Sequence, residues 1–253
     1  MRFSFLLLCL LSVSLSQAQL TDPAVSISVE PTLGHRIMNF KSRALPSFKD
    51  SINKADKWRD AISANFMLSY STSRYSRIFF GLQFQNFGFS RYRNNLKFLD
   101  TIHPEIGLVK DLSQTGSNDV EYIHRYQYLG LPVLFSSRLN VKKMKTSKLY
   151  LMFGGAINIL INHDIKTKLI GFSARGGKVF ILDGKENEAS RFNASLQMGL
   201  RLENPVLDKN TFVFIQPGIH LPILRANRSD MQAQLYAFGL QVGVVLKLEK
   251  DKT

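Results

Sequence analysis

The stretch Tyr236-Ala237-Phe238-Gly239-Leu240-Gln241-Val242-Gly243-Val244-Val245-Leu246-Lys247-Leu248 alternates between two kinds of side chain. The even-numbered residues are all large and apolar, whereas the odd-numbered residues, apart from Val245, are small or polar. A repeat of two residues predicts a β-strand. A soluble barrel packs its bulky side chains inward, but a membrane barrel turns them toward lipid and lines its interior with the small, polar face. The stretch therefore predicts a strand of a transmembrane barrel.

The same division into two faces recurs in seven further stretches of the chain. The predicted strands cover residues 24–33, 60–71, 76–90, 122–137, 147–162, 191–203, 210–224 and 232–249. Several reach the 9–11 residues that a tilted membrane strand needs, and an even number of strands is typical of bacterial single-chain barrels. The predicted fold is all-β: an eight-stranded antiparallel up-and-down transmembrane β-barrel.

The connections between these strands alternate in length. Residues 34–59, 91–121 and 163–190 are long, whereas residues 72–75, 138–146 and 204–209 are short, and residues 225–231 are intermediate. Membrane barrels have short periplasmic turns and longer extracellular loops. With both termini in the periplasm, all the long connections fall outside the cell.

Pro132 and Pro217 lie inside predicted strands, where we expect local bulges, because a closed barrel offers proline no edge.

The N-terminal residues have the features of a secretory signal. Arg2 is followed by an apolar run from Phe3 to Leu15, and Ser16-Gln17-Ala18 fits a cleavage site. This pattern predicts a signal peptide over residues 1–18 and a barrel domain over residues 19–253. The run is too short for a membrane-spanning helix. Cys9, the single cysteine, lies within it.

The formal net charge of +14 raises the question of an anionic partner. The basic residues are scattered over loops and turns, and no zinc-finger, RRM or KH pattern is present, so we expect no nucleic acid. Basic loops suit the anionic head groups at a membrane surface. The expected partners are outer-membrane lipid and other envelope or secretion-system proteins, which would contact the extracellular loops.

Two adjacent strands resemble a known family. The segments Tyr126-Gln127-Tyr128-Leu129-Gly130-Leu131-Pro132-Val133-Leu134-Phe135 and Leu149-Tyr150-Leu151-Met152-Phe153-Gly154-Gly155-Ala156 are similar to the fourth and fifth strands of the PorT-like outer-membrane β-barrel family. Residues 197–200 and 238–243 share that family's habit of inward glycines. The resemblance implies residence in the bacterial outer membrane. Since PorT itself is linked to type IX secretion and gliding motility, it also implies a component linked to type IX protein secretion. The chain departs from many outer-membrane barrels in ending on Glu249-Lys250-Asp251-Lys252-Thr253 instead of an aromatic residue.

Three histidines are the candidates for chemistry. His124, His163 and His220 fall near the outer ends of their strands, and Asp164 follows His163. A Ser–His–acid site needs these groups within hydrogen-bonding distance, and a metal site favours closely spaced ligands, which the sequence lacks. We therefore assign no catalytic, metal or cofactor-binding residue and no cofactor, and we expect a non-enzymatic protein. Three alternatives stay open: a barrel enzyme acting on lipid or peptide, a soluble periplasmic barrel binding an apolar ligand, and a selective small-solute pore, for which eight strands leave little open space.

Four charged residues have inward parity, which means that they fall on the alternate positions of a strand that face the barrel interior. They are Glu30, Arg201, Glu203 and Lys247. Unpaired charge in so narrow an interior is costly, so opposite charges should pair and close it, although an ion or proton path is an alternative.

Six tyrosines near strand ends suggest an interfacial aromatic girdle, with ordinary core packing as the other interpretation. They are Tyr70, Tyr75, Tyr122, Tyr126, Tyr128 and Tyr236.

Overall fold

A computed structural model describes residues 21–40, 53–94, 101–103, 107–109, 119–140, 146–170, 180–184, 189–206, 210–226 and 231–248. The segment interpreted as a signal peptide lies outside these ranges, so its cleavage stays a prediction. Within the described ranges, no helix is long and apolar enough to cross a membrane. A single helical turn covers residues 53–55.

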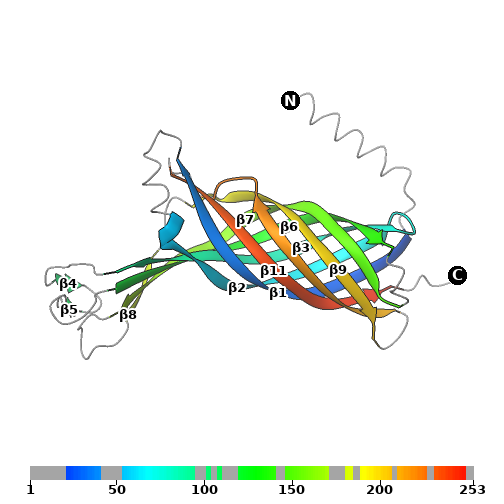
Figure 1. The fold of residues 1–253 in the computed structure, drawn as a ribbon, viewed down its shortest axis with the longest axis horizontal. Helices are drawn as coiled ribbons and strands as arrows, with labels where there is room; N and C mark the ends of the chain where they lie inside the picture. The colour runs from blue at the N-terminus through cyan, green and yellow to red at the C-terminus, as the bar shows by residue number, and fades with distance from the viewer. Residues whose placement is uncertain are drawn as a thin grey trace, which may run out of the picture.

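Eight antiparallel strands form a closed barrel (Figure 1). Around the ring they are β1 (Thr21–Phe40), β2 (Asp56–Ser71), β3 (Ser76–Arg93), β6 (Asp119–Leu139), β7 (Lys148–Ile170), β9 (Phe192–Pro205), β10 (Thr211–Pro222) and β11 (Met231–Lys247). Pairing of β1 with β11 closes the ring. Each strand pairs with its neighbours in chain order, so the predicted eight-stranded up-and-down barrel is confirmed.

The two ends of the barrel differ. At one end the strands are joined by residues 72–75, 140–147 and 206–210, and at the other by the longer segments 41–55, 94–118 and 171–191 and by residues 223–230. This alternation confirms the prediction of short turns at one end. Membrane barrels place short turns in the periplasm, so the longer connections mark the extracellular end. We call these the inner and outer ends.

At the outer end, part of the barrel continues as a projecting sheet. The strands β3, β6 and β7 run past the other strands, and β8 (Phe180–Gly184) pairs with β7 there. A short hairpin of β4 (Thr101–His103) and β5 (Gly107–Val109) lies at the same end (Figure 1). We call the outer parts of β3, β6 and β7, together with β8, the projecting sheet.

The apolar faces of the strands point away from the barrel axis. On β11, Phe238, Leu240 and Val242 are 53%, 45% and 42% exposed, whereas Gln241 between them is buried. The same alternation holds around the ring, from Ile27 on β1 onward. The exterior is thus an apolar belt, as the alternation predicts, while the interior combines polar side chains with hydrophobic clusters such as that of Met67, Phe79 and Met152.

Strand ends at the outer side differ from the predicted ones. The predicted connections 91–121 and 163–190 overlap the ends of β6 and β7, and β1 continues to Phe40 instead of ending near residue 33. Beyond the apolar belt the outward face of a strand no longer meets lipid, so the regular alternation of large apolar and small polar residues is lost. Glu121, Tyr122 and Lys168 illustrate this mixed composition.

The prolines do not produce bulges, so that prediction is wrong. The β3–β6 register passes from Phe80 opposite Val133 to Gln83 opposite Gly130 without a shift, although the pair at Pro132 is missing. The β9–β10 register likewise skips Pro217 without slipping. Each proline, which lacks a donor, interrupts the ladder on one side while the other side keeps its pairing.

A bulge does occur on β7, at Ile161. Gln127 pairs with Asn162 and Tyr128 with Leu160, so β7 has one extra residue between them. An extra residue reverses the alternation beyond it. His163 consequently turns inward, and 7% of its surface is exposed.

Candidate functional site

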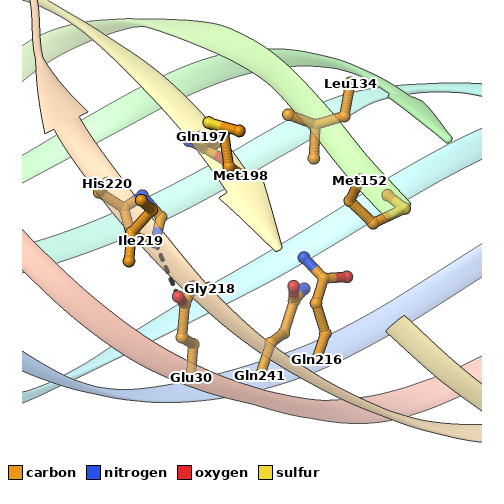
Figure 2. Close-up of a pocket in the computed structure, with 10 residues that line it drawn as sticks. All are labelled: Glu30, Leu134, Met152, Gln197, Met198, Gln216, Gly218, Ile219, His220 and Gln241. Carbon is orange, nitrogen blue, oxygen red and sulfur yellow. Dashed lines mark hydrogen bonds and ion pairs between the residues drawn. The ribbon is translucent and has the colours of Figure 1, made fainter. Parts of the chain in front are cut away.

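A carboxylate and an imidazole meet inside the barrel (Figure 2). His220 Nε2, on β10, donates a hydrogen bond to Glu30 Oε1, on β1, over 2.7 Å. Asn65 Nδ2, on β2, donates to the other carboxylate oxygen over 3.4 Å. Both side chains are more than nine-tenths buried. Gly239 on β11 leaves the space that Glu30 fills, because a Cβ atom there would collide with the carboxylate.

A layer of amides lies beside this pair. Gln83 Oε1 accepts hydrogen bonds from Gln85 and Gln197, each over 2.8 Å, and Gln241 donates to Ser28 Oγ over 2.5 Å. Two cavities among these side chains each measure about 10 Å³, and Figure 2 shows the one beside Glu30 and His220. That is room for about one water molecule. Side chains therefore fill the interior at this level.

An ion-pair cluster closes the interior near the inner end. Glu203 Oε1 lies 3.0 Å from Arg201 Nε, and Glu203 Oε2 lies 3.2 Å from Arg77 Nη1. The Arg201 guanidinium also stacks 3.6 Å from the centre of the Phe214 ring. The expected pairing of Arg201 with Glu203 is present. Arg77 was missed, although its inward parity on β3 could have identified it.

The other two predicted interior charges have different partners. Glu30 pairs with His220 and with none of the predicted interior cations. Lys247 lies over the ring of Phe212, 4.8 Å from its centre, and forms no ion pair within the part of the chain that the structure describes. The expectation that opposite charges pair thus holds for Arg201 and Glu203, whereas Glu30 bonds to an imidazole and Lys247 lies over an aromatic ring.

A second ion-pair cluster lies toward the outer end. Asp56 accepts hydrogen bonds from Arg36 Nε and from Arg91 Nε, both over 2.8 Å, and its side chain is fully buried. The Arg36 guanidinium lies 3.7 Å from the centre of the Phe89 ring. The predicted connection 34–59 contained Arg36 and Asp56. On β1 the even-numbered residues, such as Thr32, face the interior. Extending this alternation beyond residue 33 would have predicted that Arg36 also faces inward.

Two of the candidate histidines come together near this cluster. His124 stacks on Phe89 with ring centres 4.3 Å apart, and His163 stacks on Tyr126 at 4.1 Å. The two imidazole centres are 6.0 Å apart. Asp164 has the opposite parity and lies in register with Arg125. The third histidine, His220, is inside the barrel with Glu30, so the three histidines do not form one site.

The surroundings of His124 keep its imidazole neutral. His124 lies outside the apolar belt, next to Arg125 and five residues before the lipid-facing Leu129 on β6. Burial lowers the pKa of His124 to about 3, and the positive charge of Arg36 lowers it further. A base with so low a pKa is a weak proton acceptor at neutral pH.

The tyrosine girdle is confirmed only in part. Tyr75 is 52% exposed at the inner turn, and Tyr70 stacks on the lipid-facing Phe80. Tyr126 and Tyr128 are buried inside the barrel, with 1% and 0% of their surfaces exposed, so for them the prediction is wrong. Their even parity on β6, shared with the inward Gly130, outweighs their position near a strand end.

Among the described residues, no group of three or more histidine, cysteine, aspartate or glutamate side chains could hold a metal ion. The polar side chains of the interior instead bond to one another at three levels. These are the Arg36–Asp56–Arg91 cluster, the Glu30–His220 pair with its amides, and the Arg77–Glu203–Arg201 cluster. This arrangement closes the barrel and holds its strands in register.

No family model and no curated protein matches this chain. The chain is similar to solved structures of outer-membrane barrels. Neisserial surface protein A is 10% identical, with 89% of this chain and 99% of that chain covered and a TM-score of 0.42. Ail of Yersinia pestis is 12% identical (89% and 100% covered, TM-score 0.37) and OprG of Pseudomonas aeruginosa is 9% identical (92% and 99% covered, TM-score 0.37).

The exterior of the barrel decides its location. Ile27, Ile62, Leu131, Ile157 and Phe238 are all more than half exposed, and they lie on five different strands. Such a belt is stable only against hydrocarbon, and closed barrels of this kind reside in bacterial outer membranes. The protein is an outer-membrane barrel. The alternative of a soluble periplasmic barrel is wrong, because that barrel would turn these side chains inward.

Proposed function

We propose that this outer-membrane barrel has a structural or interaction role and binds another envelope protein through its projecting sheet. The observation that carries the proposal is the length of three neighbouring strands. The last lipid-facing residue on β6 is Leu129, yet the strand begins at Asp119, ten residues or roughly 33 Å farther along the strand. Anchoring in lipid alone requires no such extension.

Internal contacts hold the projecting sheet together. On its outer face, Tyr92 donates a hydrogen bond to Asp119 over 2.8 Å, and Lys57 lies 4.6 Å from the centre of the Tyr92 ring. Lys168 Nζ lies 3.9 Å from Glu121 Oε2. These contacts join β2, β3, β6 and β7, so the sheet offers a preformed surface to a partner.

The filled interior supports a role other than transport. The cavities beside Glu30 and Gln83 hold about one water each, and charged clusters lie above and below them. An eight-stranded barrel is just wide enough for side chains to fill. In a planar bilayer, the purified protein should produce no steady ion conductance.

Site-specific photo-crosslinking in intact cells tests the proposal. A photoreactive amino acid at Glu121 or Lys168 should form a discrete adduct with one envelope protein. The control position is Tyr75, which is exposed at the inner turn. The proposal predicts an adduct from the outer positions that persists at raised salt and is absent at Tyr75. Lipid adducts alone at all three positions would contradict it.

We further propose that the barrel is not an enzyme. The low pKa of His124, the stacking of His163 on Tyr126 and the bond from His220 to Glu30 support this assignment, because each contact serves packing. The purified protein should hydrolyse neither membrane phospholipids nor unstructured peptides. A turnover that is lost in His124→Ala or His163→Ala, while the variant still folds, would establish the enzymatic alternative.

The finer assignment, a component linked to type IX secretion, is supported only by the PorT-like resemblance, which rests on residues 126–135 and 149–156 and on the glycines of residues 197–200 and 238–243. Deletion of the gene tests it directly. The assignment predicts that proteins exported by that route accumulate in the periplasm and that complementation with the full chain restores their export. An unchanged set of exported proteins would remove the assignment while leaving the interaction role intact.

A further inference from the structure

Cationic side chains surround the inner mouth of the barrel. Arg77 on β3, Arg138 on β6, Lys148 on β7 and Lys247 on β11 all have the inward parity of their strands. The register brings them to one level, since Lys148 lies opposite Glu203 and Arg138 lies beside Lys148 through its pairing with Tyr150. We call these four residues, with the buried Arg201, the inner cationic ring.

Among the buried side chains that the structure describes at this end, negative charge is limited to one carboxylate. Glu203 is the carboxylate that pairs with the ring, and both of its oxygens are already held by Arg201 and Arg77. Within the described ranges, Arg138, Lys148 and Lys247 form no ion pair. Within the described ranges, five cations thus share one buried carboxylate, and Asp22 at the start of β1 is exposed. The outer cluster, by comparison, has two arginines for Asp56.

Aromatic rings position these cations without neutralising them. The ammonium groups of Lys148 and Lys247 lie 5.1 Å and 4.8 Å from the centre of the same ring, that of Phe212. The Arg77 guanidinium lies 5.1 Å from the centre of the Tyr150 ring. Stacking of this kind holds a cation in place while leaving its charge available to an anion.

One buried donor in the ring is also unused. The side chain of Arg201 is 2% exposed, and its Nη2 atom has no hydrogen-bond partner within the described part of the chain. Like charges gathered in a partly enclosed mouth repel one another, and a buried unsatisfied donor is costly. An anion that entered the mouth would relieve both effects. Clustered arginines and lysines are the side chains that proteins use to bind phosphate.

We propose that the inner cationic ring binds a multiply charged oxyanion of the phosphate class, presented from the periplasmic side. The phosphate could belong to a soluble compound or to the head group of an inner-leaflet lipid, since both offer the same oxygens. Arg77, Arg138, Lys148 and Lys247 all have the inward parity of their strands, so they face the barrel interior and not the surrounding lipid. This orientation favours a soluble phosphate over a lipid head group. The proposal depends on the orientation of the barrel and is independent of the projecting sheet.

Isothermal titration calorimetry with the full-length protein provides the test. The protein is placed in nanodiscs of phosphatidylcholine and titrated with sodium tripolyphosphate at constant ionic strength. We expect saturable binding of one anion and at least a tenfold loss of affinity in the Lys148→Gln/Lys247→Gln variant. The matched control is Lys166→Gln/Lys168→Gln, which removes the same charge from the outer half of β7 and should leave the affinity unchanged.

Further arms separate the two sources of phosphate and protect the test against misfolding. The titration is repeated in nanodiscs that contain phosphatidylglycerol. If this lipid weakens tripolyphosphate binding, and does so only when Lys148 and Lys247 are present, the ring binds a lipid head group. If the lipid leaves tripolyphosphate binding unchanged, the ring binds a soluble phosphate. If the double variant does not fold, as judged by its mobility on an unboiled gel, Arg138→Gln replaces it. Failure to bind, equal loss in the control variant, or tighter binding of oligoglutamate than of tripolyphosphate overturns the proposal.

Discussion

Glu30 and His220, 190 residues apart in the sequence, are joined by a 2.7 Å hydrogen bond inside the barrel. The bond connects β1 to β10, which are separated in the ring by β11, so it passes through the barrel interior on the inward side of β11. Together with Asn65 it ties three strands to one carboxylate. We therefore expect this pair to stabilise the arrangement of these strands around the interior.

Breaking the pair should destabilise the barrel. In Glu30→Ala, His220 loses its acceptor and stays buried, so the free energy of unfolding should fall by about 1–3 kcal/mol. The double variant Glu30→Ala/His220→Ala should lose less than the sum of the two single variants, because the second change removes no further bond. Urea unfolding in phospholipid vesicles, followed by gel mobility, measures these values. Strict additivity would show that the two side chains are not coupled.

A methyl group at Gly239 should have a similar effect. The Cβ atom of Gly239→Ala would collide with the Glu30 carboxylate and push it away from His220. We expect a loss of about 1–3 kcal/mol from this overpacking. Gly155→Ala is the control, because its Cβ atom would meet only a carbonyl oxygen at 3.1 Å. Equal stability of the two variants would contradict the role assigned to Gly239.

Asp56 should be more important for stability than its exposed neighbour Asp60. In Asp56→Asn, two arginines lose the carboxylate that they share, and removing one partner of a buried ion pair costs about 3–5 kcal/mol. Asp60→Asn should change stability by less than about 0.5 kcal/mol. Hydrogen exchange should show faster exchange of β2 and β3 amides near the outer end in the first variant alone. Similar exchange in both variants would count against the cluster.

His124 should remain neutral between pH 8 and pH 5. Its folded-state pKa of about 3 lies below the unfolded value near 6.5, so the unfolded state binds more protons between these values. The contribution of His124 to stability is therefore complete above pH 6.5 and is lost as the pH falls toward 3. Imidazole NMR signals in isotope-labelled protein report the titration directly. A His124 midpoint above pH 6 would disprove this assignment, and His124→Gln identifies the signal.

The faces of the strands could be predicted because hydrocarbon imposes one simple rule on every belt residue. Phe238, Leu240 and Val242 meet lipid, so their alternation with Gly239 and Gln241 survives in the sequence without interruption. The length of the connections likewise follows from the different surroundings of the two ends. These features require no knowledge of which side chain contacts which.

The projecting sheet and the contacts inside the barrel could not be predicted in the same way. Beyond Leu129 the outward face of β6 no longer meets lipid, while Tyr126 and Tyr128 on its inward face pack in a hydrophobic cluster, so the simple alternation of the belt disappears. One extra residue at Ile161 reverses the orientation of His163. The partner of Glu30 depends on the stagger between strands and on the gap at Gly239, neither of which a strand pattern contains.

Spin labels at adjacent positions on β11 test the central claim, that the bulky face meets lipid and the polar face lines the interior. The only cysteine, Cys9, precedes the described residues, so single cysteines can be introduced at Leu240, Gln241 and Val242 of an otherwise cysteine-free barrel once Cys9 is removed. In vesicles, electron paramagnetic resonance should show high collision rates with oxygen at Leu240 and Val242 and low rates at Gln241. The opposite pattern, with Gln241 open to oxygen and its neighbours shielded, would contradict the membrane barrel.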